Sequence, residues 1–142
     1  MMIEVLIQKK IKVSKAWICR IIEKVLRAEK RKGSIGVLIT GDHEIRKLNR
    51  SFLKHDTTTD VIAFPLGSDR NGSVESLRGD LVVSADTARR VAKEMGIPYK
   101  EELARYLVHG TLHLLGYDDH KKKDFKRMHE RQEEILRACL NR

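Results

Sequence analysis

The residues with the clearest chemical potential lie in one stretch, HGTLHLLGYDDH, which spans residues 109–120. His109 and His113 are four positions apart, so on a helix they project from one face, about 6 Å from each other. Two imidazoles at that spacing can bind one cation, as in the His-x-x-x-His half of zinc peptidase sites. Gly116 then ends the helix and lets the chain turn back. One of three side chains beyond that turn can supply a third ligand: Asp118, Asp119 or His120.

Three protein ligands and one water are typical of a catalytic zinc site rather than a structural one. Zinc peptidases of the His-Glu-x-x-His type take their general base from the residue after the first histidine. Here that residue is Gly110, which cannot act as a base. The sequence therefore disfavours a peptidase or a similar small metallohydrolase. No side chain is identified as the acid or base, and a metal-bound water, with a pKa of about 7, is proposed to take part in the reaction. The alternative interpretation is a pair of core or surface histidines that bind no ion.

The elements that must position this stretch follow from the spacing of apolar residues. Residues 100–115 are predicted to form a helix whose inner face carries Leu103, Leu107, Val108, Leu112 and Leu115. Four more helices are expected at 15–30, 42–49, 85–95 and 121–140, and the apolar stripe of the last consists of Phe125, Met128, Ile135, Leu136 and Cys139. Strands are expected at 3–7, 34–40, 60–65 and 79–84, with a long loop at 67–78.

Four residues are expected to bound these elements. Ser14 and Asp42 are the predicted caps of the first two helices. Gly33 is expected to end the first helix, and Pro65 to stop the third strand. Residues 1–142 are therefore predicted to form a single compact α+β domain, a sheet of about four strands covered by about five helices. The candidate metal site is expected at the end of one of these helices, beside the sheet.

Composition sets the class of protein and its expected location. The 142 residues are 41% hydrophobic and 35% charged, which is typical of a folded globular chain. No apolar run approaches the roughly 20 residues of a membrane span, and MMIEVLIQKK lacks the order of a signal peptide, so we expect a cytoplasmic protein without membrane contact. Cys19 and Cys139 are isolated from each other, so they predict small buried side chains rather than a thiolate metal site.

The net charge of +9 indicates a polyanionic partner, in the first place nucleic acid. Aromatic residues make up only 5% of the chain, so an extensive base-stacking platform is not expected. The remaining histidines, His43, His55 and His129, have charged neighbours and are interpreted as surface residues without a role. The candidates for contacts to a phosphate backbone are Arg46, Arg50, Lys54, Arg70, Arg78 and Arg89.

Three stretches together resemble the YbeY family of bacterial metal-dependent endoribonucleases. HGTLHLLGYDDH is similar to the family signature His-Gly-x-x-His-Leu-x-Gly-Tyr-Asp-His. LNRSFLKHDTTTDVIAFP, at residues 48–65, resembles the segment that leads into Thr-Asp-Val-Leu-Ser-Phe-Pro, and GDLVVSADTARRVAKEMG, at residues 79–96, resembles the Gly-Asp-Ile-x-Ile-Ser strand and its helix. Order and spacing agree over residues 35–136.

The resemblance implies a single-strand-specific endoribonuclease with one zinc ion, although other divalent metals are possible. Either the metal-bound water or the ribose 2′-hydroxyl is expected to attack the phosphodiester bond. It implies a role in 16S rRNA 3′-end maturation and ribosome quality control, with RNA and the ribosome as partners and no small-molecule cofactor. The alternative is a ribosome-associated RNA-binding or assembly protein whose metal is structural.

The resemblance also assigns site residues, with two departures. His109 and His113 match the first two metal ligands. The third position falls on Asp119, one residue before His120; we take His120 as the third ligand and Asp119 as the alternative. The arginine of the family pattern Leu-Asn-x-x-Tyr-Arg is Leu53 here, so Arg50 or Lys54 is expected to contact the substrate instead.

Overall fold

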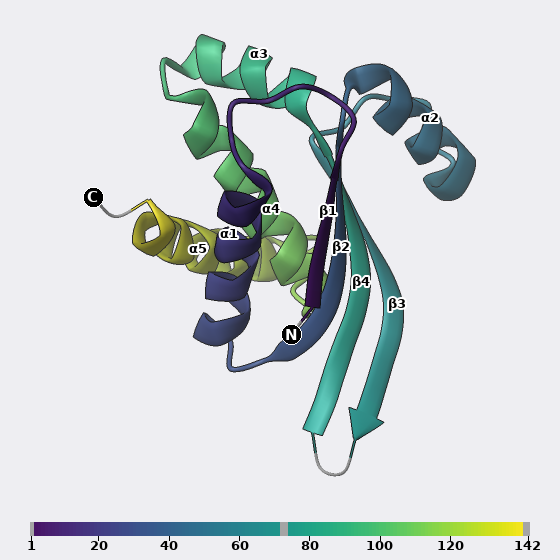
Figure 1. Ribbon diagram of the computed structural model, residues 1–142, viewed down its shortest axis with the longest axis vertical. Helices are drawn as coiled ribbons and strands as arrows, with labels where there is room; N and C mark the ends of the chain where they lie inside the picture. Colours follow the sequence, from purple (N-terminus) through teal and green to yellow (C-terminus); the bar gives the residue numbers. More distant parts are fainter. Residues whose placement is uncertain (1, 72–73, 141–142) are drawn as a thin grey trace.

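The computed structural model describes residues 2–71 and 74–140, which form four strands and five helices (Figure 1). In chain order these elements are β1 (Met2–Ile7), α1 (Lys15–Ala28), β2 (Lys32–Thr40), α2 (Asp42–Leu53), β3 (Val61–Asn71), β4 (Val74–Ser84), α3 (Ala85–Met95), α4 (Tyr99–Leu114) and α5 (Lys122–Cys139). The predicted α+β class, with one four-stranded sheet and five helices, is confirmed.

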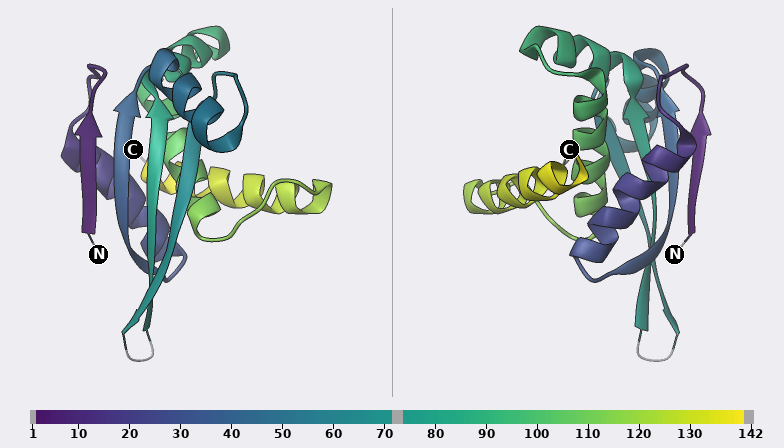
Figure 2. Two further views of the ribbon diagram at one scale, coloured as in Figure 1. Left: turned by 90° about the vertical axis from the view of Figure 1, so that its right-hand side faces the viewer. Right: turned by 60° about the vertical axis from the view of Figure 1, so that its left-hand side comes forward.

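The strands form one mixed sheet in the order β1-β2-β4-β3. β1, β2 and β4 run parallel, and β3 pairs antiparallel with β4 at one edge. Helices α1 and α4 cover one face, and α5 packs on both of them from outside, whereas α2 packs against β3 and β4 from the other face (Figure 2). Because side chains alternate across a strand, Leu81 and Val83 face the main core while Val82 faces α2.

Helix α4 forms the centre of the main core. Leu103, Leu107, Val108 and Leu112 have no exposed surface, as their helical spacing predicted, and Leu115 is half-buried. The N-terminal part of α5, in contrast, projects beyond the sheet (Figure 2). Phe125 lies there and is 53% exposed, so its predicted place in the buried stripe is wrong, although Met128, Ile135 and Leu136 are buried. Cys19 and Cys139 are half-buried rather than fully buried.

The long loop predicted at 67–78 is wrong, because β3 and β4 extend through most of it as a hairpin. Gly and Ser suggested a loop, but the backbone groups of this segment pair across the two strands. Pro65 does not stop β3 either. A proline is tolerated there because β3 is an edge strand, and the register shifts between Pro65 and Ser68.

Two predicted boundaries are also wrong. Gly33 does not end α1 but lies buried within β2, where an added Cβ would come within 2.8 Å of the Leu77 carbonyl oxygen. The chain instead leaves the helix through Lys30, which has a φ of 54°. Asp42 is the first residue of α2 rather than its cap, because its carboxylate accepts hydrogen bonds from Ser84 and Thr87. Ser14 does cap α1 by accepting from the Trp17 backbone N–H.

Within the described residues, none of the helices combines the length and the apolar composition that crossing a membrane requires.

Candidate metal centre

Helix α4 holds His109 and His113 side by side near the edge strand β3. Their ring centroids are 4.7 Å apart and the ring planes are inclined by 79°. Gly110 lets the helix approach the sheet this closely, because a Cβ at that position would lie 2.9 Å from a Leu81 methyl and 3.0 Å from a Val61 methyl. The residue after the first histidine therefore faces the sheet, and a glutamate base would not fit there.

The end of α4 returns the chain to this pair. Gly116, with a φ of 102°, adopts a left-handed conformation that favours glycine, and the Tyr117 N–H donates to the Leu112 carbonyl in a Schellman turn. Asp119 consequently lies beside the imidazoles, with its Oδ2 atom 3.4 Å from His113 Nε2. Two ligands held at about 2.1 Å by one tetrahedral ion are about 3.4 Å apart, so this separation fits a shared zinc ion.

Both imidazoles are oriented by a hydrogen bond at Nδ1. His113 Nδ1 lies 3.1 Å from the Tyr117 carbonyl oxygen, which can only accept, so Nδ1 carries the proton. His109 Nδ1 lies 2.6 Å from the Oε1 atom of Gln132, a side chain that is only 6% exposed. If the proton of His109 is likewise on Nδ1, neither imidazole carries a proton on Nε2. This is the form of histidine that binds a metal through Nε2.

The electrostatics of His113 favour the neutral ring. Burial lowers the pKa of His113, and the neighbouring His109 lowers it further, while Asp119 and the Tyr117 carbonyl oppose this shift. A metal competes with protons for Nε2, so a lowered pKa keeps the site available at neutral pH.

His120 lies apart from this group. Its side chain is 85% exposed, and its Nδ1 is hydrogen-bonded to the Asp118 carboxylate. Among the described residues, one potential metal-binding group is His109, His113 and Asp119, whose ligand atoms lie within 4.8 Å of one another, and the other joins His120 to Asp118 and Asp119. The geometry therefore unites the two predicted histidines with the alternative third ligand rather than with the preferred one. The role of each residue as a ligand stays a prediction.

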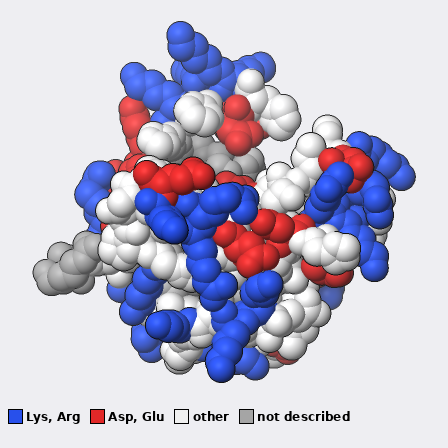
Figure 3. Space-filling model, turned by 90° about the horizontal axis from the view of Figure 1, so that it is seen from above, with Lys and Arg blue, Asp and Glu red and all other residues white. Residues whose placement is uncertain are grey.

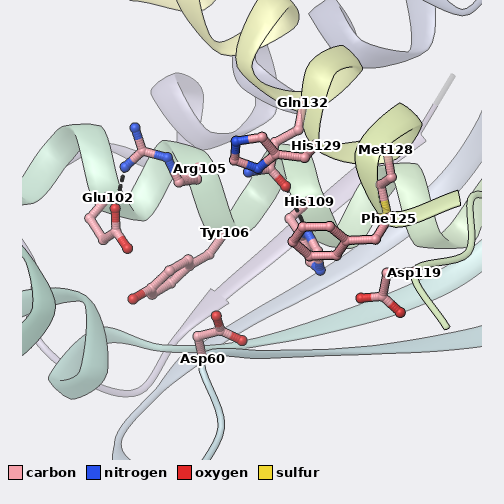
Figure 4. A pocket seen from close by; sticks show the side chains of 10 residues that line it. All are labelled: Asp60, Glu102, Arg105, Tyr106, His109, Asp119, Phe125, Met128, His129 and Gln132. Carbon is pink, nitrogen blue, oxygen red and sulfur yellow. Dashed lines mark hydrogen bonds and ion pairs between the residues drawn. The ribbon is translucent and has the colours of Figure 1, made fainter. Parts of the chain in front are cut away.

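A cavity of about 210 Å³ opens beside His109 and Asp119 (Figure 4). It lies between α4, the first turns of α5, and Asp60, which precedes β3. Its other lining side chains are Glu102, Arg105, Tyr106, Phe125, Met128, His129 and Gln132. Two of the candidate ligands, His109 and Asp119, thus border a space that a substrate can enter.

The wall around Arg105 is a largely buried polar network. Arg105 donates to Glu102, which is 5% exposed, and to Glu133 at 3.1 Å. Burial by itself lowers the pKa of Arg105, but the bonds to Glu133 and Glu102 outweigh it and raise that pKa. Burial and the Glu102 carboxylate raise the pKa of Tyr106, so its phenol stays protonated. Arg105 is therefore engaged with carboxylates and is not free to bind a phosphate.

None of the predicted phosphate contacts whose side chains the structure describes lines the cavity. Arg50 and Lys54 are exposed on α2 and at its end, and neither lines the space beside the histidines. Arg46 pairs with Asp56, and Arg89 donates to the Lys10 carbonyl oxygen. Arg78 lines a separate pocket near β1, and the side chain of Arg70 lies outside the described part of the chain.

Basic side chains nevertheless cover much of the surface, including two projections that flank the cavity side of the molecule. In Figure 3 they form the outer parts at the top and at the right, which are the N-terminal part of α5 and helix α2, and a hollow with acidic atoms lies between them. The α5 projection carries Lys121, Lys122, Lys123, Lys126 and Arg127, and the α2 projection carries Arg46, Lys47, Arg50 and Lys54.

Several cavity residues were not singled out from the sequence. Glu102, Arg105, His109 and His113 recur at three- and four-residue steps, and this polar stripe on a largely apolar helix was a usable signal. Gln132 interrupts the apolar stripe of α5, which also marks a buried polar contact. His129 was interpreted as a surface residue without a role; it is exposed, but it lines the cavity. His43 and His55 are exposed, and neither lines this cavity.

Comparison with known proteins places the chain in one family. A sequence model described as endoribonuclease YbeY matches residues 4–139. Endoribonuclease YbeY of Aquifex aeolicus is 48% identical over 87 residues, which cover 61% of this chain and 57% of that protein. Endoribonuclease YbeY of Chlorobium luteolum is 36% identical over 130 residues, 91% of each chain.

The fold agrees with a solved structure. The solution structure of TM1509 from Thermotoga maritima superimposes with a TM-score of 0.66 at 26% identity, over 97% of this chain and 89% of that one. The aligned part of the chain spans 35–57% of the length of several curated relatives. The resemblance seen in the sequence is confirmed, and the chain belongs to the endoribonuclease YbeY family.

Proposed function

We propose that this protein is a metal-dependent endoribonuclease that cleaves single-stranded RNA. One observation carries the proposal: the imidazoles of His109 and His113, each held by a hydrogen bond at Nδ1, lie with the Asp119 carboxylate beside an open cavity that His109 and Asp119 line. Its family membership supplies the reaction, because relatives across the family are named endoribonuclease YbeY. The net charge of +9 suits a polyanionic substrate.

The proposed metal is zinc, with other divalent ions as alternatives. His109, His113 and Asp119 would hold it, with His120 as the alternative third ligand. Nitrogen and carboxylate donors in a set of three suit a zinc site that keeps one position open. When bound, the ion supplies Lewis-acid chemistry and a nucleophile at neutral pH.

The chain's own residues hold the ligands and shape the space around them. Gln132 and the Tyr117 carbonyl fix the two imidazoles, and Gly110 keeps α4 against the sheet. Asp60 lines the cavity opposite α4 and offers a carboxylate that can accept a proton from a hydroxyl in the substrate. The two basic projections would attract the phosphate backbone from outside (Figure 3). Because carboxylates line the cavity, the bound ion would supply the positive charge that a phosphate needs there.

We further infer a cellular role in 16S rRNA 3′-end maturation and ribosome quality control, in the cytoplasm, from the family resemblance. Residues 1–142 would act as one metallohydrolase domain with RNA and the ribosome as partners and without a small-molecule cofactor. The alternative role is a ribosome-associated RNA-binding or assembly protein with a structural metal. Removal of a structural ion would lower Tm strongly, whereas removal of a catalytic ion would stop cleavage with little unfolding.

The test compares His113→Ala with His43→Ala, a variant of an exposed histidine on α2, on a labelled single-stranded RNA and its duplex. Loss of one ligand is expected to reduce cleavage of the single strand about 1,000-fold or more, with an unchanged circular dichroism spectrum. Chelation of the wild type is expected to stop cleavage and lower Tm only slightly. Cleavage by His113→Ala at the wild-type rate would contradict the proposal, and a large fall in Tm on chelation would favour the structural metal.

A further inference from the structure

Phe125 is an exposed aromatic residue at the mouth of the candidate metal centre. It lies in the first turn of α5, it is 53% exposed, and it lines the same cavity as His109 and Asp119 (Figure 4). A large apolar side chain at the entrance of a polar cavity offers a flat surface that the chain itself does not cover. Phe52, the other strongly exposed phenylalanine among the described residues, instead meets Phe64 edge to face on the far side of the sheet.

A second ring supports Phe125. His129 follows one helical turn later, with its ring centroid 6.0 Å from that of Phe125 and the two planes inclined by only 10°. Both rings belong to one helix, so the nearly parallel arrangement limits the orientations that Phe125 can take. His129 also lines the cavity, which places both rings along one wall.

The charge around the ring identifies the ligand chemistry. The first turns of α5 carry exposed cations before and after Phe125, among them Lys123 and Lys126. They form the basic projection at the top of Figure 3. A flat apolar face among cations fits an unpaired nucleotide, whose phosphates need positive charge and whose base has two open faces. A paired base offers no such face because its neighbours in the duplex cover it.

We propose that Phe125, supported by His129, is a stacking platform for one unpaired nucleobase next to the cleaved phosphodiester bond. This inference rests on the proposed endoribonuclease function. A single platform agrees with the low aromatic content of the chain. It accepts any base, because every base has a π-face, and it selects single strands over duplexes by shape.

The test combines side-chain and substrate changes. Phe125→Ala removes the ring, Phe125→Leu keeps a large apolar side chain without the aromatic face, and Met95→Ala removes a similarly exposed apolar side chain from α3. Each protein is assayed on a single-stranded oligonucleotide and on copies with one abasic nucleotide at successive positions around the cleaved bond. Loss of one stacked base is expected to lower the wild-type kcat/KM about 10-fold at one position.

The variants then separate stacking from general packing. Phe125→Ala and Phe125→Leu are expected to lose about 10-fold on the intact strand and to show no further loss on the abasic strand, whereas Met95→Ala behaves as the wild type. Equal kcat/KM for wild type and Phe125→Ala on the intact strand, or an unchanged abasic effect in Phe125→Ala, would overturn the stacking platform.

Binding provides a readout that does not depend on cleavage. A 2-aminopurine placed at the sensitive position is expected to be quenched by the wild type and not by Phe125→Ala. If the wild type cleaves no RNA, the proposed function fails, and the probe is then scanned along the strand. Equal quenching by both proteins at every position would reject Phe125 as a platform independently.

Discussion

Two clusters of polar side chains in this protein differ in what their hydrogen bonds leave open. One is the candidate metal centre at the end of α4. The other joins the starts of α2 and α3, where Asp42 accepts from Ser84 Oγ and Thr87 Oγ1, each at 2.7 Å, and from Arg90 at 2.9 Å. Asp86 in turn accepts from the Asp42 backbone N–H and pairs with Lys9.

The α2–α3 cluster is defined by these six residues, which form hydrogen bonds and ion pairs with one another. At the candidate metal centre, internal partners instead occupy the Nδ1 atom of each imidazole and leave both Nε2 atoms without such a partner among the described residues. His113 Nε2 lies 3.4 Å from the Asp119 carboxylate, and ligand atoms of His109, His113 and Asp119 lie within 4.8 Å of one another. The difference indicates that the α2–α3 cluster joins two helices, while the candidate metal centre is arranged to bind an ion. Substitutions should therefore affect stability in one cluster and metal affinity in the other.

The largest effect that distinguishes the two clusters is the loss of zinc affinity when the third ligand is removed. Asp119→Ala is expected to weaken zinc binding about 100-fold or more, since loss of even an outer hydrogen-bond partner weakens metal binding about 10–100-fold. His120→Ala, the matched control, should change it less than about threefold, because this side chain is directed toward Asp118 and solvent. Competition with a chromophoric chelator measures both affinities. A large loss in His120→Ala with none in Asp119→Ala would make His120 the third ligand.

The α2–α3 cluster predicts the opposite behaviour. Asp42→Ala removes the common acceptor of three side chains and is expected to lower the free energy of unfolding by about 2 kcal/mol. Zinc affinity and cleavage per folded molecule should stay at the wild-type value. Urea unfolding and chelator competition check the two halves of this expectation. A loss of metal affinity as large as that of Asp119→Ala would abolish the distinction between the clusters.

The same cluster has a defined pH dependence. Burial raises the pKa of Asp42, but hydrogen bonds from Thr87 and Ser84 and the charge of Arg90 outweigh it, so the folded pKa is lowered. The stabilisation is therefore fully present above the unfolded pKa of about 3.9 and is lost as pH falls through the folded pKa. The stability difference between wild type and Asp42→Ala should be constant from pH 7 down to about 5 and shrink below about pH 4. A difference that grows on acidification would contradict this sign.

The sequence predicted what local periodicity determines and missed what distant segments determine. Helical spacing placed His109 and His113 on one face, and the Gly116 turn brought the following segment back to them. The cap assigned to Asp42 failed because Ser84 and Thr87, more than 40 positions away, bind its carboxylate. The prediction of a loop at 67–78 was wrong for a related reason, because the local composition does not reveal that β3 pairs with β4.

Gln132 offers the smallest effect that still separates the two clusters, because it is buried like a structural residue yet touches a candidate ligand. Its Oε1 fixes Nδ1 of His109, and its Nε2 donates to Glu133 at 3.0 Å. Gln132→Ala is expected to weaken zinc binding about 10-fold. Gln132→Glu keeps the acceptor for Nδ1 but loses the donor to Glu133, so it should lower Tm while zinc affinity stays within about threefold of the wild type. Chelator competition and thermal unfolding on the same samples distinguish the two roles, because a purely structural Gln132 would lower Tm in both variants and leave zinc affinity unchanged in both.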